Sequence, residues 1–324
     1  MASSIQVICI FLKEKIKRLV VIEGPTASGK TALSVELAHY FKTVILSADS
    51  RQFYKEMSIG TAKPSFEEQN GIKHYFIDSH SISEEVTAAR FAEEANEVLK
   101  SLFEMHETII LTGGSGMFVD ALCIGLDNIP SSRELRDQLS VEVEKEGLSL
   151  LLEELKVKDP IFFNQVDKQN PVRVIRAIEA IRLTGLPFSE LRKSTPQKNN
   201  FEVLRFIIEH PREQLYNRIN LRVDNMMESG LLEEVKTLLP FQHLNALKTV
   251  GYRELFDFID GKTDLETAIE LIKQNSRRYA KRQLTWLKRH EDATILTFDK
   301  TASMLNHILS TLNTLENSEK NSLE

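Results

Sequence analysis

Cysteine is almost absent from this chain, which contains only Cys9 and Cys123 among 324 residues. Two cysteines so far apart exclude the disulfide framework of a small secreted domain, and they make a reducing cytosol the expected compartment. The histidines contain no pair at metal-ligand spacing, so we expect no structural zinc site.

Long apolar runs are missing as well. The longest one near the N-terminus covers residues 7–12, which is too short to span a membrane, and it lacks the basic start and the small-residue cleavage site of a secretory signal. We therefore expect a cytoplasmic protein without membrane contact. Residues 1–17 are interpreted as a loosely attached N-terminal extension to which we assign no function.

An excess of positive charge is the third missing feature. The formal net charge is −6, which argues against unspecific binding to nucleic acid but leaves room for a local basic site. Apolar residues make up 42% of the chain, which is ample for a buried core. The length suggests two domains, or one large α/β domain with an insertion.

What the chain does contain is a complete phosphate-binding loop. Residues 24–31 read Gly-Pro-Thr-Ala-Ser-Gly-Lys-Thr and directly follow the apolar run 19–22. An apolar stripe in residues 33–41 predicts the helix that must come next, so that backbone N–H groups can surround a phosphate. Lys30 would supply a point charge to phosphate oxygens, and the Thr31 hydroxyl would ligate Mg²⁺.

Strands and helices alternate through the first third of the chain. We expect strands at residues 19–22, 44–47 and 108–111, and helices at residues 30–41 and 91–105. Because polar or glycine-rich segments follow these strands, the pattern predicts a parallel, doubly wound α/β sheet with ligands at the carboxyl ends of its strands.

An all-helical block then interrupts this alternation. Helices are predicted at residues 135–145, 148–156 and 172–184, and a strand returns at 203–209. A strand that returns after such a block indicates an inserted domain. We therefore predict a core of residues 18–128 plus 200–312 that ends in helices, an inserted helical domain of residues 129–199, and a disordered polar tail of residues 313–324.

Asp49 follows the second predicted strand, at the ligand-binding edge beside the phosphate loop. Its carboxylate could serve as a general base, as a magnesium ligand or as a helix cap, and the residues alone leave these three roles open. The hydrogen-bonding and aromatic side chains that follow it would suit a base that must also recognise a planar heterocycle.

Two further segments could join the same edge. Residues 113–116, Gly-Gly-Ser-Gly, could hold an anion through free N–H groups and the Ser115 hydroxyl, although a tight turn explains them equally well. Arg218 and Arg222 share a helical face. We favour a solvated face with a pair to the turn of Asp224 for Arg218, and weigh that interpretation against a reach into the phosphate site for Arg222.

One segment is strongly basic. Residues 277–290 carry six Lys or Arg and no acid, together with the only tryptophan, Trp286. Basic side chains interleaved with aromatics suit a nucleic-acid backbone with stacked bases. The alternative is a solvated helix face with Trp286 in the core, and the two roles can coexist on opposite faces.

Taken together and in order, these segments resemble the tRNA dimethylallyltransferases. The resemblance covers roughly residues 18–290 and rests on residues 24–31, Asp49-Ser-Arg-Gln-x-Tyr54, Ile59-Gly-Thr-Ala-Lys-Pro64, His74-Tyr75, residues 113–116, Asn170-Pro-x-Arg173-x-x-Arg176-Ala177, Val250-Gly-Tyr-Arg253 and Lys281-Arg-Gln-Leu-Thr-Trp286. Ser115 stands where many members of this family have threonine, which keeps the hydroxyl.

The resemblance implies a P-loop NTPase-like core and a defined reaction. A dimethylallyl group would pass from dimethylallyl diphosphate to N6 of the adenosine immediately 3′ of the anticodon in certain tRNAs, with release of diphosphate. Mg²⁺ would bridge the diphosphate oxygens, with Thr31 as its protein ligand. We expect a monomer that binds the tRNA anticodon stem-loop and extrudes the target base into its channel.

The resemblance also implies the site residues. Asp49 would take the proton of the amine, and Ser115 and Arg222 would stabilise the leaving diphosphate. The diphosphate would lie against Gly24, Thr26, Ala27, Ser28, Gly29, Lys30 and Thr31. The tRNA, clamped on its far side by the inserted domain, would contact Asp49, Ser50, Arg51, Gln52, Arg136, Arg173, Arg176, Gly251, Tyr252, Arg253, Lys281, Arg282, Gln283 and Trp286.

Three other functions are weighed against this one. A small-molecule P-loop kinase is disfavoured because the chain has no lid-like arginine cluster for a nucleoside triphosphate. A prenyltransferase acting on free adenine nucleotide is disfavoured by the inserted domain and the basic residues 277–290. An RNA-binding protein without activity would leave Asp49 and the phosphate loop without a purpose.

Overall fold

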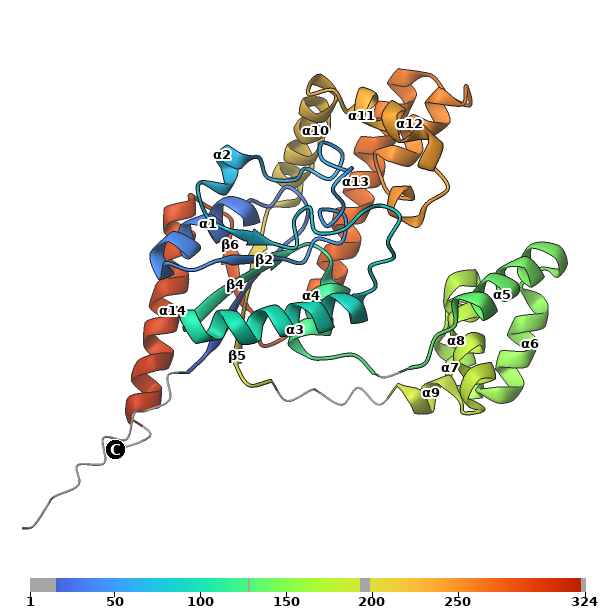
Figure 1. Cartoon of the computed structure of the whole chain (residues 1–324), viewed down its shortest axis with the longest axis horizontal. Coiled ribbons are helices and arrows are strands. Elements are labelled where there is room, and N and C mark those ends of the chain that lie inside the picture. The colour runs from blue at the N-terminus through green and yellow to red at the C-terminus, as the bar shows by residue number, and fades with distance from the viewer. Residues whose placement is uncertain (1–15, 128, 193–198, 322–324) are drawn as a thin grey trace, which may run out of the picture. The chain divides into compact units, whose positions relative to one another are not determined.

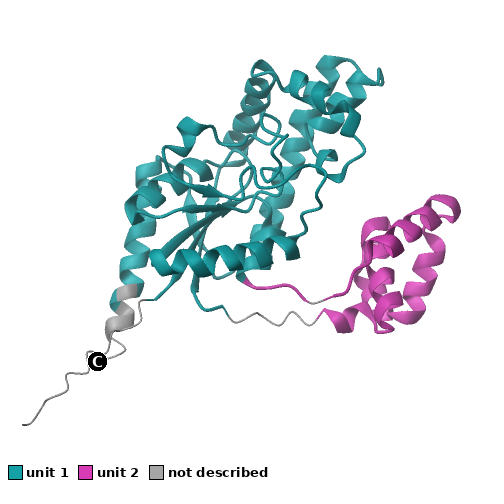
Figure 2. Ribbon diagram, viewed as in Figure 1, with its two compact units in different colours: residues 1–123, 199–324 teal, residues 124–198 magenta. Residues whose placement is uncertain are grey.

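The computed structural model describes residues 16–127, 129–192 and 199–321. Most of the predicted N-terminal extension and the last three residues of the predicted tail therefore lie outside the described residues. The chain divides into two compact units (Figure 2). Unit 1 combines residues 1–123 with residues 199–324, and unit 2 consists of residues 124–198.

Unit 1 is built on a parallel sheet. Among the described residues the strand order is β3-β2-β4-β1-β5-β6 (Figure 1), and every pairing is parallel. This arrangement confirms the predicted α/β fold class. The strands are β1 (Arg18–Glu23), β2 (Ile45–Ser47), β3 (His74–Tyr75), β4 (Thr108–Gly113), β5 (Glu202–Glu209) and β6 (Thr294–Thr297).

Both faces of the sheet are covered by helices, because β1 is apolar on both sides. Leu19 and Val21 pack in one core cluster with α3 (Ala88–Met105) and α4 (Gly116–Cys123). Val20 and Ile22 pack in a second cluster with α1 (Lys30–Phe41) and α14 (Thr301–Asn321), on the other face (Figure 1).

A group of helices that follows β5 and precedes β6 in the sequence completes unit 1 (Figure 1). Its long members α10 and α13 pack against each other through Leu215, Ile219 and Ala280. The group consists of α10 (Arg212–Glu228), α11 (Leu231–Leu238), the short helices η1 (Leu239–Phe241) and η2 (Asn245–Leu247), α12 (Tyr252–Ile259) and α13 (Leu265–Leu287), while the short α2 (Phe66–Gln69) precedes β3.

Unit 2 is helical and has a hydrophobic core of its own, which includes Leu139, Leu155, Val174 and Ile178. Three of its described helices begin at a residue whose side chain caps them. The side chain of Asp159, for example, accepts the N–H of Phe162, and Pro160 follows it at the first helical position. The helices are α5 (Arg133–Glu146), α6 (Ser149–Lys158), α7 (Pro160–Gln165), α8 (Pro171–Thr184) and α9 (Phe188–Leu191), all inside the range that we predicted as an inserted domain.

Two segments near the C-terminus differ from the sequence prediction. β6 was not predicted, because four residues with threonine at both ends and one buried leucine carry too little pattern to indicate a strand. Helix α14 continues through residues 313–321, which we expected to be disordered. The stripe of Met304, Ile308 and Leu312 anchors this helix in the second core cluster, and the polar residues extend it from there.

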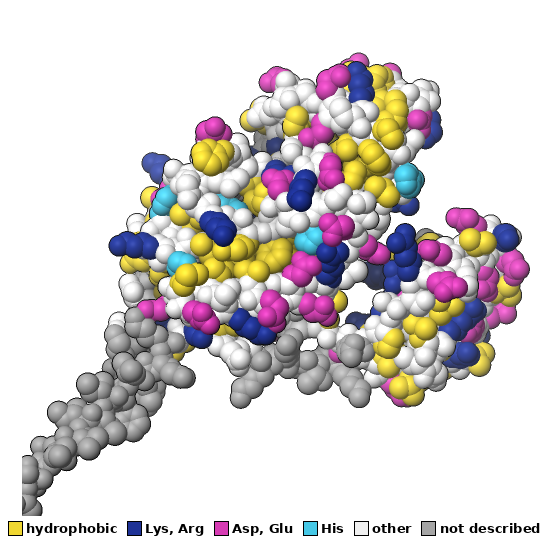
Figure 3. All heavy atoms as spheres, viewed as in Figure 1, with side chains coloured by type: hydrophobic (Ala, Val, Ile, Leu, Met, Phe, Trp, Pro, Cys, Tyr) yellow, Lys and Arg dark blue, Asp and Glu magenta, His cyan; other side chains and the backbone are white. Residues whose placement is uncertain are grey.

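On one face of the molecule, side chains of opposite charge are mixed. On the face seen in Figure 3, Lys and Arg side chains are interspersed with Asp and Glu side chains over each unit. Within the described ranges, no helix is both long and apolar enough to cross a membrane.

Candidate functional site

The phosphate loop connects β1 to α1 at the carboxyl edge of the sheet. Gly29 precedes the first helical residue with φ 90°, and Ala27 has φ 62°, so the loop turns through two left-handed positions. The first residues of α1, Lys30 and Thr31, are half-buried. The helix N-terminus and these turns give the loop the geometry of an anion site.

Lys30 lies folded against its own loop. Its Nζ donates to the carbonyl oxygens of Gly24 at 2.9 Å and Pro25 at 2.8 Å. Desolvation lowers the pKa of Lys30 to about 8, although the charge of Asp49 opposes this shift. An anion in the loop would therefore meet a cation that is poorly solvated and ready to pair.

This shift of the Lys30 pKa leads to a pH dependence. Because the folded pKa lies below the ordinary value of 10.5, the charged ammonium weakens the fold below about pH 8, and the free energy of unfolding should rise between pH 8 and 10.5. Affinity for inorganic diphosphate should change in the opposite direction and fall above about pH 8, by at most about tenfold per pH unit.

Calorimetric titration with diphosphate over this pH range measures the effect. The Lys30→Arg variant is the control, because an arginine stays charged throughout and any titration of the diphosphate itself affects both proteins equally. A wild-type pH profile that runs parallel to that of Lys30→Arg would contradict the assignment.

Two arginines of α10 contact the phosphate loop. Arg222 donates from Nη1 to the Thr26 hydroxyl at 3.1 Å and from Nη2 to the carbonyl of Ala62 at 3.4 Å. Desolvation lowers the pKa of Arg222, and Asp49 opposes this effect. Arg222 thus reaches the phosphate site, the alternative that the sequence left open.

Arg218 has other contacts than the sequence interpretation gave it. Its Nε donates to the carbonyl oxygen of Ala27 at 2.8 Å, and its guanidinium lies 5.0 Å from the centroid of the Phe298 ring. Asp224, the expected partner in its turn, pairs with Lys273 at 2.8 Å instead. Arg218 is exposed, as expected, but it also supports the loop, and its helical spacing from Arg222 was the available signal.

Asp49 lies just beyond β2 at the same edge of the sheet. Its Oδ1 accepts the N–H of Arg51 at 3.1 Å in a turn rather than at the start of a helix, while Oδ2 has no hydrogen bond from the described residues. Its charge acts on Lys30, Arg222 and Tyr279. The geometry leaves one carboxylate oxygen able to accept a proton from a ligand.

Ser115 joins the loops that follow β2 and β4. Its Oγ accepts the N–H of Ser50 and donates to the Ser50 hydroxyl, both at 3.0 Å. A cavity of about 240 Å³ opens beside these residues. Its walls include Glu23, Gly24, Ser50, the segment 113–118, Tyr279, Arg282, Gln283, Trp286 and Leu287.

Helix α13 supplies one wall of this cavity. Trp286 packs on Gly116, where a Cβ would lie 2.3 Å from its ring, and its Nε1 donates to Asp120 at 2.8 Å. Gln283 contacts the phosphate loop at Thr26 and the loop after β4 at Gly114. Lys281 and Arg282 are exposed. The tryptophan therefore has a structural role, and Arg282, four residues before it, lines the same cavity while remaining exposed.

A buried charged network beneath the cavity was not predicted. Arg205 on β5 donates to Glu23 and to Asp120, both at 2.8 Å, and Nε2 of His290 lies 3.2 Å from Asp120. Burial raises the pKa of Glu23. Because Asp120 also holds Trp286, this network fixes the cavity wall to the sheet.

Several predicted tRNA contacts of unit 1 are engaged within the protein. Gln52 donates to the carbonyls of Thr61 and Ala62, and Arg51 donates to those of Asn245 and Ala246.

The Gly251-Tyr-Arg253 segment is similarly divided between the core and the surface. Tyr252 is fully buried, and its hydroxyl donates to Glu234 at 2.6 Å, so its ring offers no surface to an RNA in this structure. Gly251 donates its N–H to Glu254 at 2.8 Å, whereas Arg253 remains 55% exposed and able to contact a partner.

In unit 2, the predicted arginines divide in the same way. Glu179 is completely buried and binds both Arg136, at 3.1 Å, and Arg176, at 2.8 Å. Arg176 also donates to the carbonyls of Ile129 and Pro130. Arg173 is exposed, and its guanidinium has no partner among the described residues. These contacts give Arg136 and Arg176 a structural task, because each helps to neutralise a buried carboxylate.

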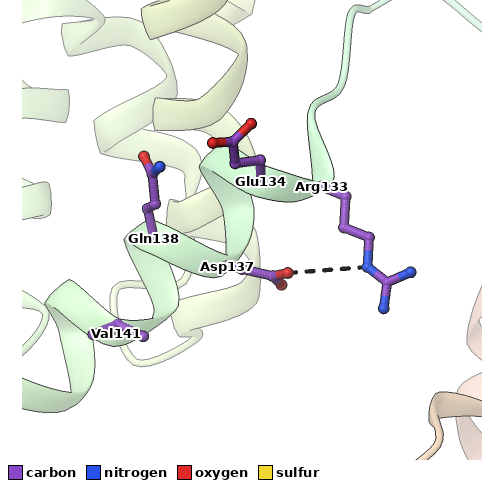
Figure 4. A pocket seen from close by; sticks show the side chains of 5 residues that line it. All are labelled: Arg133, Glu134, Asp137, Gln138 and Val141. Carbon is purple, nitrogen blue, oxygen red and sulfur yellow. Dashed lines mark ion pairs between the residues drawn. The ribbon is translucent and has the colours of Figure 1, made fainter.

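A surface hollow on unit 2 carries no site. Figure 4 shows its lining side chains, which all come from α5: Arg133, Glu134, Asp137, Gln138 and Val141. The Arg133–Asp137 pair is 3.9 Å long and joins two exposed side chains. One helix alone cannot enclose a ligand, and such a pair contributes little.

The sequence matches a known family over most of its length. Residues 52–290 match the family model described as IPP transferase. The chain is 49% identical to a tRNA dimethylallyltransferase of Cytophaga hutchinsonii over 84% of its own length and 90% of the relative's. It is 46% identical to tRNA dimethylallyltransferase 1 of Bacteroides thetaiotaomicron, over 85% and 89%.

Solved structures agree with the sequence relatives. The tRNA isopentenylpyrophosphate transferase of Bacillus halodurans superimposes with a TM-score of 0.70 at 35% identity, covering 95% of this chain and all of that one. A eukaryotic dimethylallyltransferase acting on tRNA gives a TM-score of 0.77 at 27% identity, over 93% of this chain and 80% of that one. From its sequence and its fold, this chain belongs to the IPP transferase family.

Proposed function

We propose that this protein transfers a dimethylallyl group from dimethylallyl diphosphate to N6 of the adenosine 3′-adjacent to the anticodon of tRNAs, and releases diphosphate. The observation that carries the proposal is the meeting of three parts at one sheet edge: a phosphate loop with Lys30 and Arg222, the free carboxylate oxygen of Asp49, and a cavity that Gly24, Ser50 and α13 help to line. Relatives named tRNA dimethylallyltransferase support the reaction.

The chemistry follows from these parts. The diphosphate would bind residues 24–31, and the branched alkyl group would enter the cavity beside Phe118, Trp286 and Leu287. As the carbon–oxygen bond breaks, Lys30 and Arg222 stabilise the charge that develops on the diphosphate. The adenine N6 forms the new bond to carbon, and its proton passes to Asp49. Ser115 would act through Ser50 in this structure, because its hydroxyl is engaged there.

The loop fits a magnesium ion that is bound largely by the donor. No group of three His, Cys, Asp or Glu side chains able to hold a metal occurs in the part of the chain that the structure describes. Mg²⁺ commonly takes one or two protein ligands and completes its shell with phosphate oxygens and water, so Thr31 suffices as its protein ligand. When bound, the ion would neutralise part of the diphosphate charge.

Exposed basic side chains on both units would contact the tRNA. Arg253, Lys281 and Arg282 are exposed on unit 1 and Arg173 on unit 2. The adenine must leave its stack to reach the cavity, and unit 2 would clamp the stem-loop. Arg136, Arg176, Gln52 and Tyr252 would support these surfaces from within rather than bind the RNA.

Neutralising Arg282 and Arg289 together should weaken tRNA binding and reduce its dependence on salt, because each is expected to pair with a phosphate. Arg289 is exposed, and its guanidinium lies 4.7 Å from the Trp286 ring centroid. The slope of log Kd against log salt should fall by about two, with donor affinity unchanged. Lys236→Gln with Lys262→Gln is the control. An equal loss of donor affinity would place the two arginines in the phosphate site.

Transfer of label from dimethylallyl diphosphate to tRNA, AMP and ATP, measured side by side, tests the proposed function. We expect label in tRNA alone. Label in AMP or ATP would indicate a prenyltransferase of free nucleotides, and a lack of label in tRNA would refute the proposal.

We also propose that the protein is a cytoplasmic monomer. Cys123 is a free and buried thiol, and burial raises its pKa to about 12, which fits a reducing compartment and gives it no nucleophilic role. Light scattering during size-exclusion chromatography measures the oligomeric state.

A further inference from the structure

Gln283 connects the two loops that meet at the cavity. Its amide oxygen accepts the N–H of Thr26 at 2.8 Å, and its amide nitrogen donates to the carbonyl oxygen of Gly114 at 2.7 Å. The residue is only 7% exposed. Since the acceptor and the donor end of the amide are both engaged with main-chain atoms, the side chain has little left to offer an RNA.

Gly114 is required for this contact. A Cβ at this position would lie 2.5 Å from Nε2 of Gln283, and the next atoms are 3.7 Å away or more. The backbone of Gly114 is outside the left-handed region. An alanine would therefore displace the end of one flexible side chain without straining the backbone.

Thr26 is held from two helices at once. Arg222 of α10 donates to its hydroxyl, while Gln283 of α13 accepts its N–H. Lys30 donates to the carbonyls of Gly24 and Pro25, the two residues that precede Thr26. The first half of the phosphate loop is thus fixed by side chains, and Gln283 is the one that ties it to the loop after β4.

We propose that Gln283 is a positioning residue for the donor diphosphate. It keeps Thr26 and Gly114 in register so that the phosphate loop presents its N–H groups and Lys30 to the diphosphate, while Lys281 and Arg282 of the same helix face the acceptor. The inference replaces the predicted tRNA contact of Gln283, and it rests on the proposed function, because it takes the phosphate loop as the donor site.

The Gln283→Met variant tests the inference, because it keeps the length of the side chain and removes both hydrogen bonds. Gln274→Met, an exposed position on the same helix, is the matched control. For Gln283→Met, the Kd of inorganic diphosphate and the KM of dimethylallyl diphosphate should rise by about tenfold or more, because two shielded main-chain groups lose their partners. The Kd of an anticodon stem-loop and kcat at saturating donor should stay within about twofold, as expected for a loss of uniform donor binding.

A second variant reaches the same contact from the other side. Gly114→Ala should reproduce the loss of diphosphate affinity, and the double variant should be no worse than the more impaired single variant, because both act on one pair of hydrogen bonds.

The proposal is overturned if Gln283→Met weakens the stem-loop as much as the donor, if it behaves like Gln274→Met, or if Gly114→Ala binds diphosphate normally. Wild-type protein that binds diphosphate but transfers nothing to tRNA would instead refute the proposed function, and the diphosphate titrations would still test Gln283.

Discussion

Replacing Asp49 by asparagine should lower kcat for dimethylallyl transfer by about two to four orders of magnitude, the usual contribution of a general base. Asparagine keeps the size of the side chain and its Oδ1 can still accept the N–H of Arg51, so the loop should stay in place. The amide cannot take a proton from the amine at neutral pH. Affinity for tRNA and for the donor should therefore remain close to that of the wild type.

Single-turnover transfer with saturating tRNA and donor measures this effect without interference from product release. Asp257→Asn serves as the control, because Asp257 is an exposed carboxylate that pairs with Lys262 away from the site. Undiminished turnover in Asp49→Asn would remove Asp49 from the role of base, and a large loss of donor affinity would indicate that its main task is to pair with Lys30 and Arg222.

Replacing Arg222 by glutamine should lower kcat/KM by about two to three orders of magnitude, which is typical for the loss of one donor to a developing negative charge. Arg222 is the cation of α10 that reaches Thr26, and desolvation strengthens its interaction with an anion. Arg222→Lys should recover part of the activity, because it restores the charge but not the fork of two donors.

Arg212→Gln is the matched control for this substitution. Arg212 lies on the same helix, is exposed, and has its guanidinium 5.1 Å from the Tyr216 ring centroid. Thermal unfolding of all three variants separates a loss of fold from a loss of catalysis, since Arg222 also donates to the carbonyl of Ala62. Activities of Arg222→Gln and Arg212→Gln that are equal would contradict a role in leaving-group stabilisation.

The sequence predicted those parts of the site that are encoded locally. The phosphate loop could be recognised because its glycines, Lys30 and Thr31 stand between an apolar strand and a helix with an apolar stripe. Asp49 could be placed beside it because carboxyl ends of parallel strands meet at one edge. For the same reason the segment 113–116 was expected there, and the structure brings all three together.

The charged network below the cavity could not be predicted, because its members come from distant parts of the chain. Glu23 and Arg205 meet only because β5, which follows unit 2 in sequence, pairs with β1. No spacing in the sequence indicates that pairing. Asp120, within α4, and His290, just after the end of α13, join the network because tertiary packing brings these two helices together.

The predicted tRNA contacts show a different limit. A motif identifies a residue without telling which side of its helix faces the core, and so Tyr252 and Gln283 were grouped with Arg253 and Arg282. Burial separates them: the first two hold loops in place inside unit 1, and the two arginines reach solvent. The tRNA-binding roles of the exposed residues stay predictions.

The most direct measurement for this account is mass spectrometry of nuclease fragments from tRNA that has been incubated with the protein and dimethylallyl diphosphate. The account predicts that one fragment gains a single dimethylallyl group, that the group lies on N6 of the adenosine 3′-adjacent to the anticodon, and that Asp49→Asn slows the gain by about two to four orders of magnitude. Unmodified tRNA, or a group at another nucleotide, would contradict it.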